Sequence, residues 1–587
     1  MSVDIVSTAV PRELAVDLAT TPFSRRGSYF AVSRVADPSL RAPDQHEHGV
    51  YLRTVRGDAR HREILRLLLD GGADAMSETT AGRLVLRHDG TAVEVVLDGP
   101  GRAYLRVTGG SVTLDFRAAS QYDAVLPERD GVWRFVDSGA NRNYRLRVTG
   151  GTARFDARWD GIRNSEARLR VTPGDTDGFA TGSAVIVIDE YGSAVRDDRP
   201  APVADVAAAA QADFDAWWRL HGGDQRGDPR LDDAVRLATF VTWAAIVPAG
   251  GLLRRESMLM SKNRMTNVWS WDHCFNAMAL WRNPDAAADQ LFAVFDHQDE
   301  HGCLPDYVND AGVERNFVKP PIHGWSIGHL MDRGGLTADA VAALYTPLGR
   351  WTDWWFAHRV YSDDGVPSYN HGNDSGWDNA TTFGVGVPVQ SPDLLAYLAL
   401  QMRTLGRMAD ALGRRTEATA WRTRADATIR MLCERFWVDG RFVARDTRTG
   451  AVIDADSLIT LMPLVLGELL PAEQRAASVE RLFNGGYLTR NGLATEPLWS
   501  PLYEADGYWR GPIWAPSTML LVDGLARAGY ADLAADIRDR FVDTCAAAGM
   551  AENFDAVTGA GLRDRSMTWT ASVFLTMVSE RAAAHPV

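Results

Sequence analysis

The stretch SPDLLAYLALQMRTLGRMADALG, residues 391–413, carries the pattern that decides the fold. Its apolar side chains recur every three or four residues, which is the spacing of one face of an α-helix. The same period returns after Pro229, in segments separated by clusters of Gly, Pro, Asn and Asp, and it predicts twelve helices. Their expected ranges are 230–247, 271–283, 285–301, 321–333, 337–359, 391–413, 415–437, 456–470, 472–484, 511–529, 530–549 and 566–584.

The connections between these segments alternate in length. Those after even-numbered helices are short, as at Asn283-Pro284 and Leu470-Pro471, whereas most of those after odd-numbered helices are long. Short links join antiparallel neighbours, so we expect six helical hairpins, and six hairpins can close into a double ring. The predicted fold class is mainly α, an (α/α)6 barrel preceded by an N-terminal antiparallel β-sandwich domain.

In such a ring every long connection emerges at the same end of the barrel. Side chains that are far apart in the sequence would then meet on one rim, and these loops are rich in Trp, Asp, Glu and Tyr. The residues expected to line that rim are Asp272, Tyr307, Asp378, Asp446, Trp509 and Glu552.

The part of the chain from about Phe30 to about Ser193 has a different pattern. Short runs alternate between apolar and polar residues, as in residues 83–97, and Asp89-Gly90 and Asp130-Gly131 are turn signals. This pattern predicts antiparallel strands packed as a sandwich. The Ala-rich segment that follows predicts a linker helix. The expected domains are 1–195 (β-sandwich), 196–227 (linker helix) and 228–587 (barrel).

Composition limits the kinds of partner. The 587 residues include 62 Lys and Arg against 76 Asp and Glu, and the net charge of −14 has the wrong sign for binding nucleic acid. The four cysteines, Cys274, Cys303, Cys433 and Cys545, form no CxxC pair, which indicates reduced thiols. There is no signal-peptide pattern and no apolar run of 18 residues. We therefore expect a cytoplasmic protein with no membrane partner, and its oligomeric state stays open.

Tryptophan is concentrated in the predicted barrel, where 15 of the 19 lie from residue 228 onward. Indole faces beside carboxylates suit sugar rings, although indoles also fill protein cores. We therefore expect a small-molecule carbohydrate as the partner. The tryptophans in or beside the long loops are Trp269, Trp271, Trp377, Trp499, Trp509 and Trp514.

Two carboxylates in these loops could act as acid and base. Asp378 follows the indole of Trp377 in the segment SGWDN, and partial desolvation would raise its pKa, as a general acid requires. Glu552 begins the segment ENFD shortly before the last helix. Each segment alone could also be an ordinary turn or a solvated loop. On one rim, however, the pair could work across a glycosidic bond, and their separation would decide between retention and inversion.

Four motifs occur in the order found in a known enzyme family: WDHCF (271–275), SGWD (375–378), YWRGPIW (508–514) and ENFD (552–555). With them, residues 230–587 resemble glycoside hydrolase family 63 and its trehalase-like relatives. These are inverting (α/α)6 enzymes that include α-glucosidases and mannosylglycerate or glucosylglycerate hydrolases. The resemblance implies that Asp378 is the general acid and Glu552 the base, with no metal and no cofactor. It also implies that the first sugar is bound by Trp271, Asp272, Trp509 and Arg510.

Departures from the family bear on the substrate. Arg264 stands seven residues before Trp271, where trehalases have an arginine, but Asn267 replaces their glutamate. Their Gln-Trp-Asp signature is replaced by Tyr508-Trp509-Arg510, which indicates a substrate other than trehalose. The segment 380–383, ATTF, replaces the usual Arg-Trp pair after the acid, so the contacts in the aglycone subsite are expected to differ.

A cationic side chain could recognise the aglycone. Lys319 or Arg510 could pair with a carboxylate or phosphate, or equally could bond sugar hydroxyls. The predicted function is inverting hydrolysis of an α-glycosidic bond, with an α-glucoside expected, in a small oligosaccharide or glycoside. The predicted substrate-binding residues are Trp271, Asp272, Tyr307, Trp377, Trp509, Arg510, Trp514, Arg264 and Lys319.

Three other functions stay open at this point, and one of them is a non-catalytic sugar-binding protein, which the same aromatic rim would serve. The segment HQDEH matches the HxxEH zinc pattern of inverzincin metallopeptidases, with His297 and His301 as ligands, but Gly302 and Pro305 end the helix at once. Related barrels also include glycoside phosphorylases, in which inorganic phosphate replaces the activated water. Nucleotide-binding motifs and the GxSxG elbow have no match in a suitable context.

Overall fold

The structure is a computed structural model that describes residues 14, 16–34, 48–57, 63–70, 72–73, 75–116, 120–129, 131–174, 182–195, 198–222 and 228–584. These residues divide into two compact units. The first extends to Arg219 and includes Trp243–Val247, and the second comprises Leu220–Thr242 and the residues from Pro248 onward. Residues 1–13, Asp130 of one predicted turn and residues 223–227 of the predicted linker lie outside the described residues. The boundaries expected from the sequence stay a prediction.

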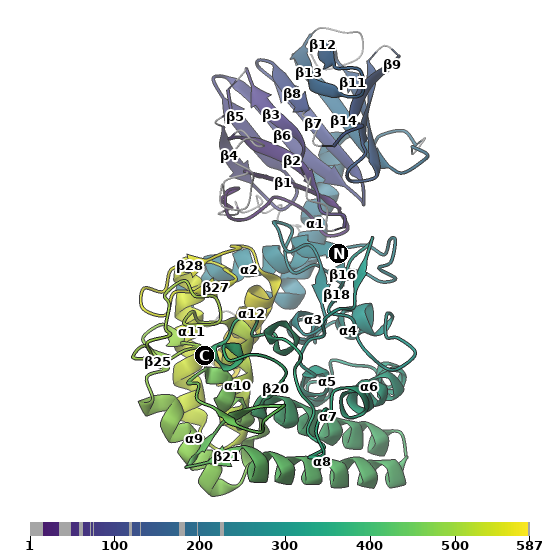
Figure 1. The fold of residues 1–587 in the computed structure, drawn as a ribbon. Helices are drawn as coiled ribbons and strands as arrows, with labels where there is room; N and C mark the ends of the chain where they lie inside the picture. The colour runs from purple at the N-terminus through teal and green to yellow at the C-terminus, as the bar shows by residue number, and fades with distance from the viewer. Residues whose placement is uncertain are drawn as a thin grey trace, which may run out of the picture. The chain divides into compact units, whose positions relative to one another are not determined.

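The first unit contains two antiparallel sheets (Figure 1). Six strands are ordered β1-β2-β3-β8-β13-β12 and eight are ordered β4-β5-β6-β7-β14-β11-β10-β9. Contacts of β13 with β7 and β14, and of β3 with β6, bring the two sheets face to face. The strands are β1 (Phe30–Arg34), β2 (Val50–Thr54), β3 (Glu63–Leu69), β4 (Met76–Thr79), β5 (Leu84–His88), β6 (Thr91–Asp98), β7 (Arg102–Thr108), β8 (Val112–Phe116), β9 (Ala124–Arg129), β10 (Val132–Asp137), β11 (Arg142–Thr149), β12 (Gly151–Trp159), β13 (Asn164–Pro173) and β14 (Ser183–Tyr191).

The hairpin between β5 and β6 shows how the alternating sequence becomes a sheet. His88 pairs with Thr91, and the two residues between them, Asp89 and Gly90, have φ of 44° and 82°. Positive φ at both positions is the geometry of the tight hairpin turn that Asp-Gly favours. The predicted Asp89-Gly90 turn is therefore confirmed. After the sheets, the Ala-rich segment forms α1 (Val203–His221).

The second unit contains the helical domain (Figure 1). Six of its helices contact one another in a closed ring, in the order α3, α5, α7, η5, α10, α12 and back to α3. Five others, α4, α6, α8, α9 and α11, each contact one or two members of this ring. The helices are α2 (Asp232–Ala245), α3 (Asp272–Ala279), α4 (Pro284–Phe295), α5 (His323–Asp332), α6 (Ala338–His358), α7 (Pro392–Ala411), α8 (Arg415–Phe436), the 3₁₀ helix η5 (Leu458–Leu469), α9 (Ala472–Asn484), α10 (Ala515–Arg527), α11 (Ala531–Ala548) and α12 (Thr568–Ala584).

Each of the twelve predicted segments overlaps one of these helices; eleven contain their helix, and α4 begins one residue before its predicted range and ends at Phe295 instead of residue 301. The class needs a correction, because the strands of the first unit make the chain an antiparallel β region followed by a helical domain rather than a mainly α protein. The turn into α4 shows why one short link works: the Asn283 side chain accepts from the N–H of Ala286, and Pro284 takes the first helical position.

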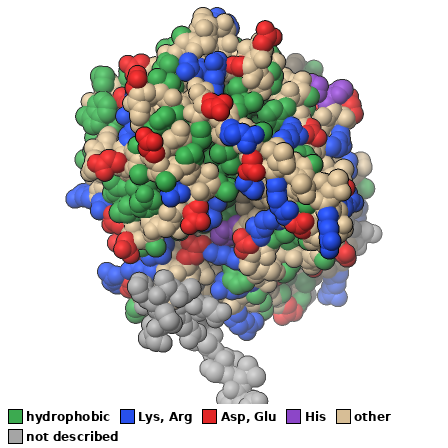
Figure 2. All heavy atoms as spheres, turned by 90° about the horizontal axis from the view of Figure 1, so that it is seen from below, with side chains coloured by type: hydrophobic (Ala, Val, Ile, Leu, Met, Phe, Trp, Pro, Cys, Tyr) green, Lys and Arg blue, Asp and Glu red, His purple; other side chains and the backbone are tan. Residues whose placement is uncertain are grey.

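The surface seen in Figure 2 mixes acidic, basic and hydrophobic side chains, with no broad area of one charge. Among the described residues, no helix combines the length and the apolar character needed to cross a membrane.

Candidate functional site

Asp378 lies in the loop between α6 and α7, and this loop folds around a different carboxylate. Asp374 is fully buried and accepts hydrogen bonds from the N–H groups of Val318 (3.1 Å) and Asn370 (2.8 Å). The guanidinium of Arg359 donates to it at 2.6 Å. The turn that leads into Asp378 is therefore held rigidly, as a catalytic side chain requires.

Gly376 brings this loop against the ring of helices. Its φ is 73°, and a Cβ atom at this position would lie 2.5 Å from Cζ2 of Trp271. Glycine is therefore needed twice, for the left-handed backbone and for the close approach of the indole.

The carboxyl of Asp378 faces a buried ion pair. The Nζ of Lys319 lies 4.0 Å from Oδ1 of Asp378 and 3.2 Å from Oδ1 of Asp306. Burial raises the pKa of Asp378 above its usual value, while Lys319 lowers it, Asp306 raises it and His371 lowers it. A raised pKa keeps part of this carboxyl protonated where an ordinary aspartate would be ionised.

Glu552 has a different environment, made of hydrogen-bond donors. The hydroxyl of Tyr508 donates to Oε1 at 3.0 Å, and the backbone N–H of Asp564 donates to Oε2 at 3.3 Å. The pKa of Glu552 is raised to about 7, because burial and the neighbouring Asp564 carboxylate raise it by more than the two hydrogen bonds lower it. A carboxylate that only accepts is suited to the ionised form that a base needs.

Tyr508 interacts with both carboxylates, through a hydrogen bond to Glu552 and through the charge of Asp378. Its φ is 64°, a conformation that is uncommon for a non-glycine residue and that aims the ring at Glu552. Burial raises the pKa of the Tyr508 hydroxyl, and Glu552, Asp378 and Asp272 raise it further. The charges of three carboxylates therefore act on one hydroxyl, and one of them, Glu552, accepts its hydrogen bond. Asn379 supports this arrangement. Its side-chain oxygen accepts from the backbone N–H of Trp509, and its side-chain NH₂ donates to the backbone carbonyl of Gly507, each at 3.0 Å.

Asp272 is the third carboxylate and occupies the first turn of α3, where the helix dipole favours a negative charge. The side chain is buried, and burial raises its pKa well above the usual value, while Lys319 lowers it. Within the described residues its Oδ2 atom has no hydrogen-bond partner. An unsatisfied buried oxygen of this kind is the expected state of a group that a ligand hydroxyl completes.

Four of the predicted tryptophans, Trp271, Trp377, Trp509 and Trp514, meet beside these carboxylates. Trp509 and Trp514 are stacked with ring centroids 4.0 Å apart and planes at 5°, and Trp377 lies 4.7 Å from Trp509. Trp271 is 6.1 Å from Trp509, and Trp569 meets Trp514 edge to face. The predicted rings pack against one another and are buried, so they form a wall of the site rather than an open platform.

The other predicted residues differ in their placement. Tyr307 lies in β18 (Tyr307–Val308), paired with Trp269 at a ring distance of 5.4 Å. The backbone N–H of Arg264 donates to the Asp564 carboxylate at 3.2 Å. The backbone N–H of Asp564 in turn donates to Glu552, so the Arg264 segment lies next to the residue that supports Glu552. The Arg510 guanidinium pairs with Glu504 at 2.8 Å.

Asp446 of the expected rim and Trp499 of the loop tryptophans serve local structure. The carboxylate of Asp446 accepts from the N–H groups of Arg448 and Thr449, each at 2.9 Å, and hydrogen bonds to Arg448 and Thr449 lower its pKa to about 2. Trp499 is 60% exposed, and its indole N–H donates to the Gly485 carbonyl.

The HxxEH segment does not form a zinc site. The helix α4 ends at Phe295, before the motif, and the ring of His297 lies 2.8 Å from the carbonyl oxygen of Leu252. The His301 side chain is exposed.

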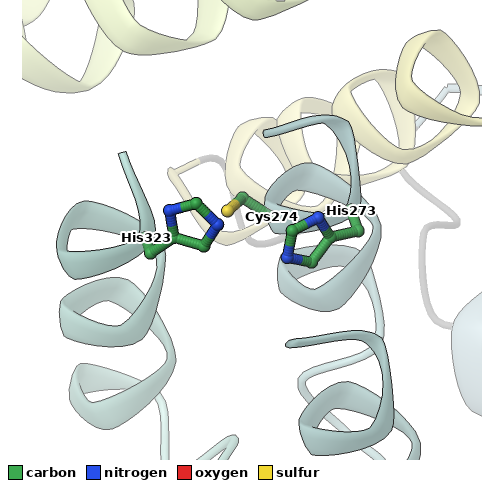
Figure 3. A group of neighbouring side chains, drawn as sticks. All are labelled: His273, Cys274 and His323. Carbon is green, nitrogen blue, oxygen red and sulfur yellow. The ribbon is translucent and has the colours of Figure 1, made fainter. Parts of the chain in front are cut away.

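Another group, one that sequence reasoning did not single out, has metal-ligand spacing. Figure 3 shows His323 on α5 facing His273 and Cys274 on α3, and within the described ranges this is the group whose ligand atoms all lie within 4.8 Å of one another. Burial lowers the pKa of His273 to about 4 and raises that of the Cys274 thiol. Without an ion, burial keeps the thiol protonated, and a metal that bound here would have to displace that proton. The His273 Nδ1 atom lies 2.8 Å from the Trp269 carbonyl oxygen.

Sequence reasoning missed the residues that support the two carboxyls. The motif YWRGPIW includes Tyr508, but the sequence assigns it no role. The supporting residues Asp306, Asn373 and Asp564 are not among the residues predicted from the sequence. Asp564 could have been suspected, since it is a further carboxylate in the same loop as Glu552. Nothing in the sequence signals the pairing of Asp306 with Lys319.

Comparisons with known proteins define the class. A family described as the mannosylglycerate hydrolase MGH1-like glycoside hydrolase domain matches residues 265–570. The mannosylglycerate hydrolase of Rubrobacter radiotolerans is 24% identical over 458 residues, 61% of this chain and 99% of that protein. The glucosylglycerate hydrolase of Mycolicibacterium hassiacum is 23% identical over 407 residues, 53% of this chain and 91% of that protein.

A solved bacterial glucoamylase in complex with acarbose shares the fold over 97% of this chain and 95% of its own, with a TM-score of 0.61 and 12% identity. The relatives cleave glycosidic bonds, and this chain is a glycoside hydrolase. It belongs to the mannosylglycerate hydrolase MGH1-like family, since the match spans more than half of its length. The resemblance stated from its four motifs is confirmed.

Proposed function

We propose that this protein hydrolyses an α-glycosidic bond with inversion, at a site built on the long loops of an (α/α)6 barrel. The observation that carries the proposal is the position of Tyr508, whose hydroxyl donates to Glu552 at 3.0 Å and whose pKa is also raised by the charges of Asp378 and Asp272. Two of these carboxyls have contrasting surroundings, as an acid and base pair needs. Asp378 lies beside a lysine in a partly buried loop, and Glu552 only accepts hydrogen bonds.

In the proposed reaction Asp378 starts protonated and Glu552 ionised. Asp378 gives its proton to the glycosidic oxygen as the bond from C1 to that oxygen breaks. Glu552 takes a proton from a water molecule that attacks C1 from the opposite face, so an α-glycoside releases a β-sugar. Asp272 would accept hydrogen bonds from sugar hydroxyls through its unsatisfied oxygen. No step requires a metal.

The names of the relatives supply the candidate substrates. Mannosylglycerate and glucosylglycerate join a hexose to a small anionic aglycone, and both satisfy the expectation of a small glycoside. We expect an α-glucoside or an α-mannoside of this kind. The cytoplasmic location and the predicted domain boundaries stay predictions.

The test is proton NMR of the wild-type protein with a panel of α-mannosylglycerate, α-glucosylglycerate, simple α-glucosides and α-mannosides, and trehalose. We expect one substrate to release the β-anomer first. Asp378→Asn and Glu552→Gln should each lower kcat/KM by a factor of about 10² to 10⁴, because each removes one proton-transfer group.

Three outcomes would contradict the proposal. Release of the α-anomer would establish retention, and cleavage that survives both substitutions would place the site elsewhere. A sugar phosphate that forms only when inorganic phosphate is present would identify a phosphorylase. Circular dichroism of both variants controls for folding.

A further inference from the structure

Lysine is almost absent from this chain. Of the 62 basic residues only Lys262 and Lys319 are lysines, so 60 are arginines. Both lysines belong to the helical domain, and both are buried, at 2% and 4% of full exposure. A chain that uses arginine nearly everywhere has kept a compact ammonium at these two positions, where a broad guanidinium with five donors would need more acceptors.

The ammonium of Lys319 interacts with two protein residues, Asn373 and Asp306. It donates to the backbone carbonyl of Asn373 at 2.9 Å and to the side-chain oxygen of the same residue. It also pairs with Oδ1 of Asp306 at 3.2 Å. Two of its three N–H donors bind the oxygens of Asn373, and its charge pairs with the Asp306 carboxylate. Protein groups therefore already fix the position of this ammonium, which is 4% exposed.

These contacts join two long loops. Lys319 and Asp306 belong to the loop between α4 and α5, whereas Asn373 and Asp378 belong to the loop between α6 and α7. The Asn373 side chain also donates to Asp306 at 3.2 Å, which closes the triangle. Asn373 stands five residues before Asp378, so the triangle anchors the start of the segment that carries the acid.

We propose that Lys319 is a positioning residue, which with Asp306 and Asn373 fixes the loop of Asp378 and sets the charge beside its carboxyl, instead of binding the substrate. This inference rests on the proposed role of Asp378 as the general acid. It replaces the expectation that Lys319 contacts the sugar or its aglycone.

The charge of Lys319 predicts a direction for the pKa shift of Asp378, and a purely structural role predicts none. The Lys319 ammonium lowers the pKa of Asp378, and the Asp306 carboxylate raises it. The two partners of one ion pair therefore act in opposite directions on the same proton. Three other titratable groups act on Asp378, and substitution of Lys319 or Asp306 leaves them in place. They are His371 on the same loop, Tyr508 on the loop before α10 and Asp272 on α3.

The experiment compares pH profiles of kcat/KM for wild type, Lys319→Met, Asp306→Asn and the double variant, with the panel substrate that wild type cleaves fastest. Loss of the Asp378 proton defines the alkaline limb of the profile under the proposed mechanism. We expect Lys319→Met to move this limb up by about one pH unit and Asp306→Asn to move it down. The double variant should return the limb to within about half a unit of wild type, because both charges are gone.

The double variant also guards against misfolding, since removal of one partner of a buried pair is more harmful than removal of both. An alkaline limb that stays at the wild-type pH in all three folded variants would overturn the proposal. A KM that rises more than tenfold in Lys319→Met while the limb does not move would also overturn it, because that result indicates a substrate contact. Asp378→Asn separates the two ideas. If that variant keeps wild-type activity, the proposed function fails; if it is inactive while the limbs stay fixed, only the role of Lys319 fails.

Discussion

Glu552 and Asp378 are both carboxyls, and their neighbours make them chemically unlike. Glu552 is buried and receives two hydrogen bonds, with a pKa raised to about 7. Asp378 keeps 37% of its side chain exposed and lies near an ammonium. As a base, Glu552 is active above its own pKa, so the acid limb of the kcat/KM profile is expected near pH 7.

Substitution of Tyr508 tests this residue environment. Tyr508→Phe removes a hydrogen bond that favours the ionised form of Glu552, so the pKa of Glu552 should rise. We expect the acid limb of kcat/KM to move up by about half a unit to one unit. The rate at pH 6 should therefore fall more than the rate at pH 8, and a pH series of initial rates measures both.

Tyr503→Phe is the matched control for that experiment. Tyr503 lies in the same loop, and in the described part of the chain its hydroxyl has no hydrogen-bond partner. The acid limb of the kcat/KM profile of Tyr503→Phe should coincide with that of the wild-type protein. An unchanged limb in Tyr508→Phe would mean that this hydroxyl does not control the base.

At the scale of elements, the acid-bearing loop depends on one close contact with the helical ring. A Cβ atom on Gly376 would meet Cζ2 of Trp271 at 2.5 Å, and its φ of 73° suits glycine. Gly376→Ala should destabilise the domain by about 2–4 kcal/mol, from backbone strain and a displaced indole. Scanning calorimetry would record this as a lower Tm.

Gly349→Ala is the control within a neighbouring element. Gly349 lies inside α6, and a Cβ atom there would meet Cζ2 of Trp421 at an ordinary 3.5 Å. Alanine favours a helix over glycine by about 0.5–1 kcal/mol, so this variant should be as stable as wild type or more stable. Equal Tm values for the two variants would refute the close contact at Gly376.

The helices could be predicted and the contacts between loops could not. A long helix such as α7 repeats its apolar period many times, so its range is visible in the sequence. The carboxylates Asp378 and Glu552 were found because each follows a recognisable motif. The hydrogen bond from Tyr508 to Glu552 spans 44 positions and has no periodicity. Asp446 was expected on the rim from its loop alone, but its carboxylate is occupied by the turn that follows it.

At the scale of the whole molecule, the chain combines two units with separate cores, an antiparallel β region and a helical domain. A metal is not part of the proposed chemistry of either. In the described part of the chain, metal-ligand residue types occur in the exposed turn of His301 and in the buried group of His273, Cys274 and His323. In the second, burial favours the neutral thiol of Cys274.

Metal removal tests this view on the intact protein. After dialysis against EDTA we expect unchanged activity on the panel substrate and less than about 0.1 equivalent of zinc per chain, since a filled structural site would hold about one. Elemental analysis before and after dialysis gives the measurement, with a known zinc enzyme treated in parallel. One equivalent of zinc that is lost together with activity would refute the prediction.

The parallel pair of Trp509 and Trp514 has a consequence for how this enzyme can be observed. Two indoles with centroids 4.0 Å apart and planes at 5° share their electronic excitation, so their absorption is that of a coupled dimer. The pair adjoins Tyr508, which touches the proposed base. A sugar that shifts either ring alters the coupling, and the protein carries an intrinsic optical reporter of occupancy at its own reaction centre.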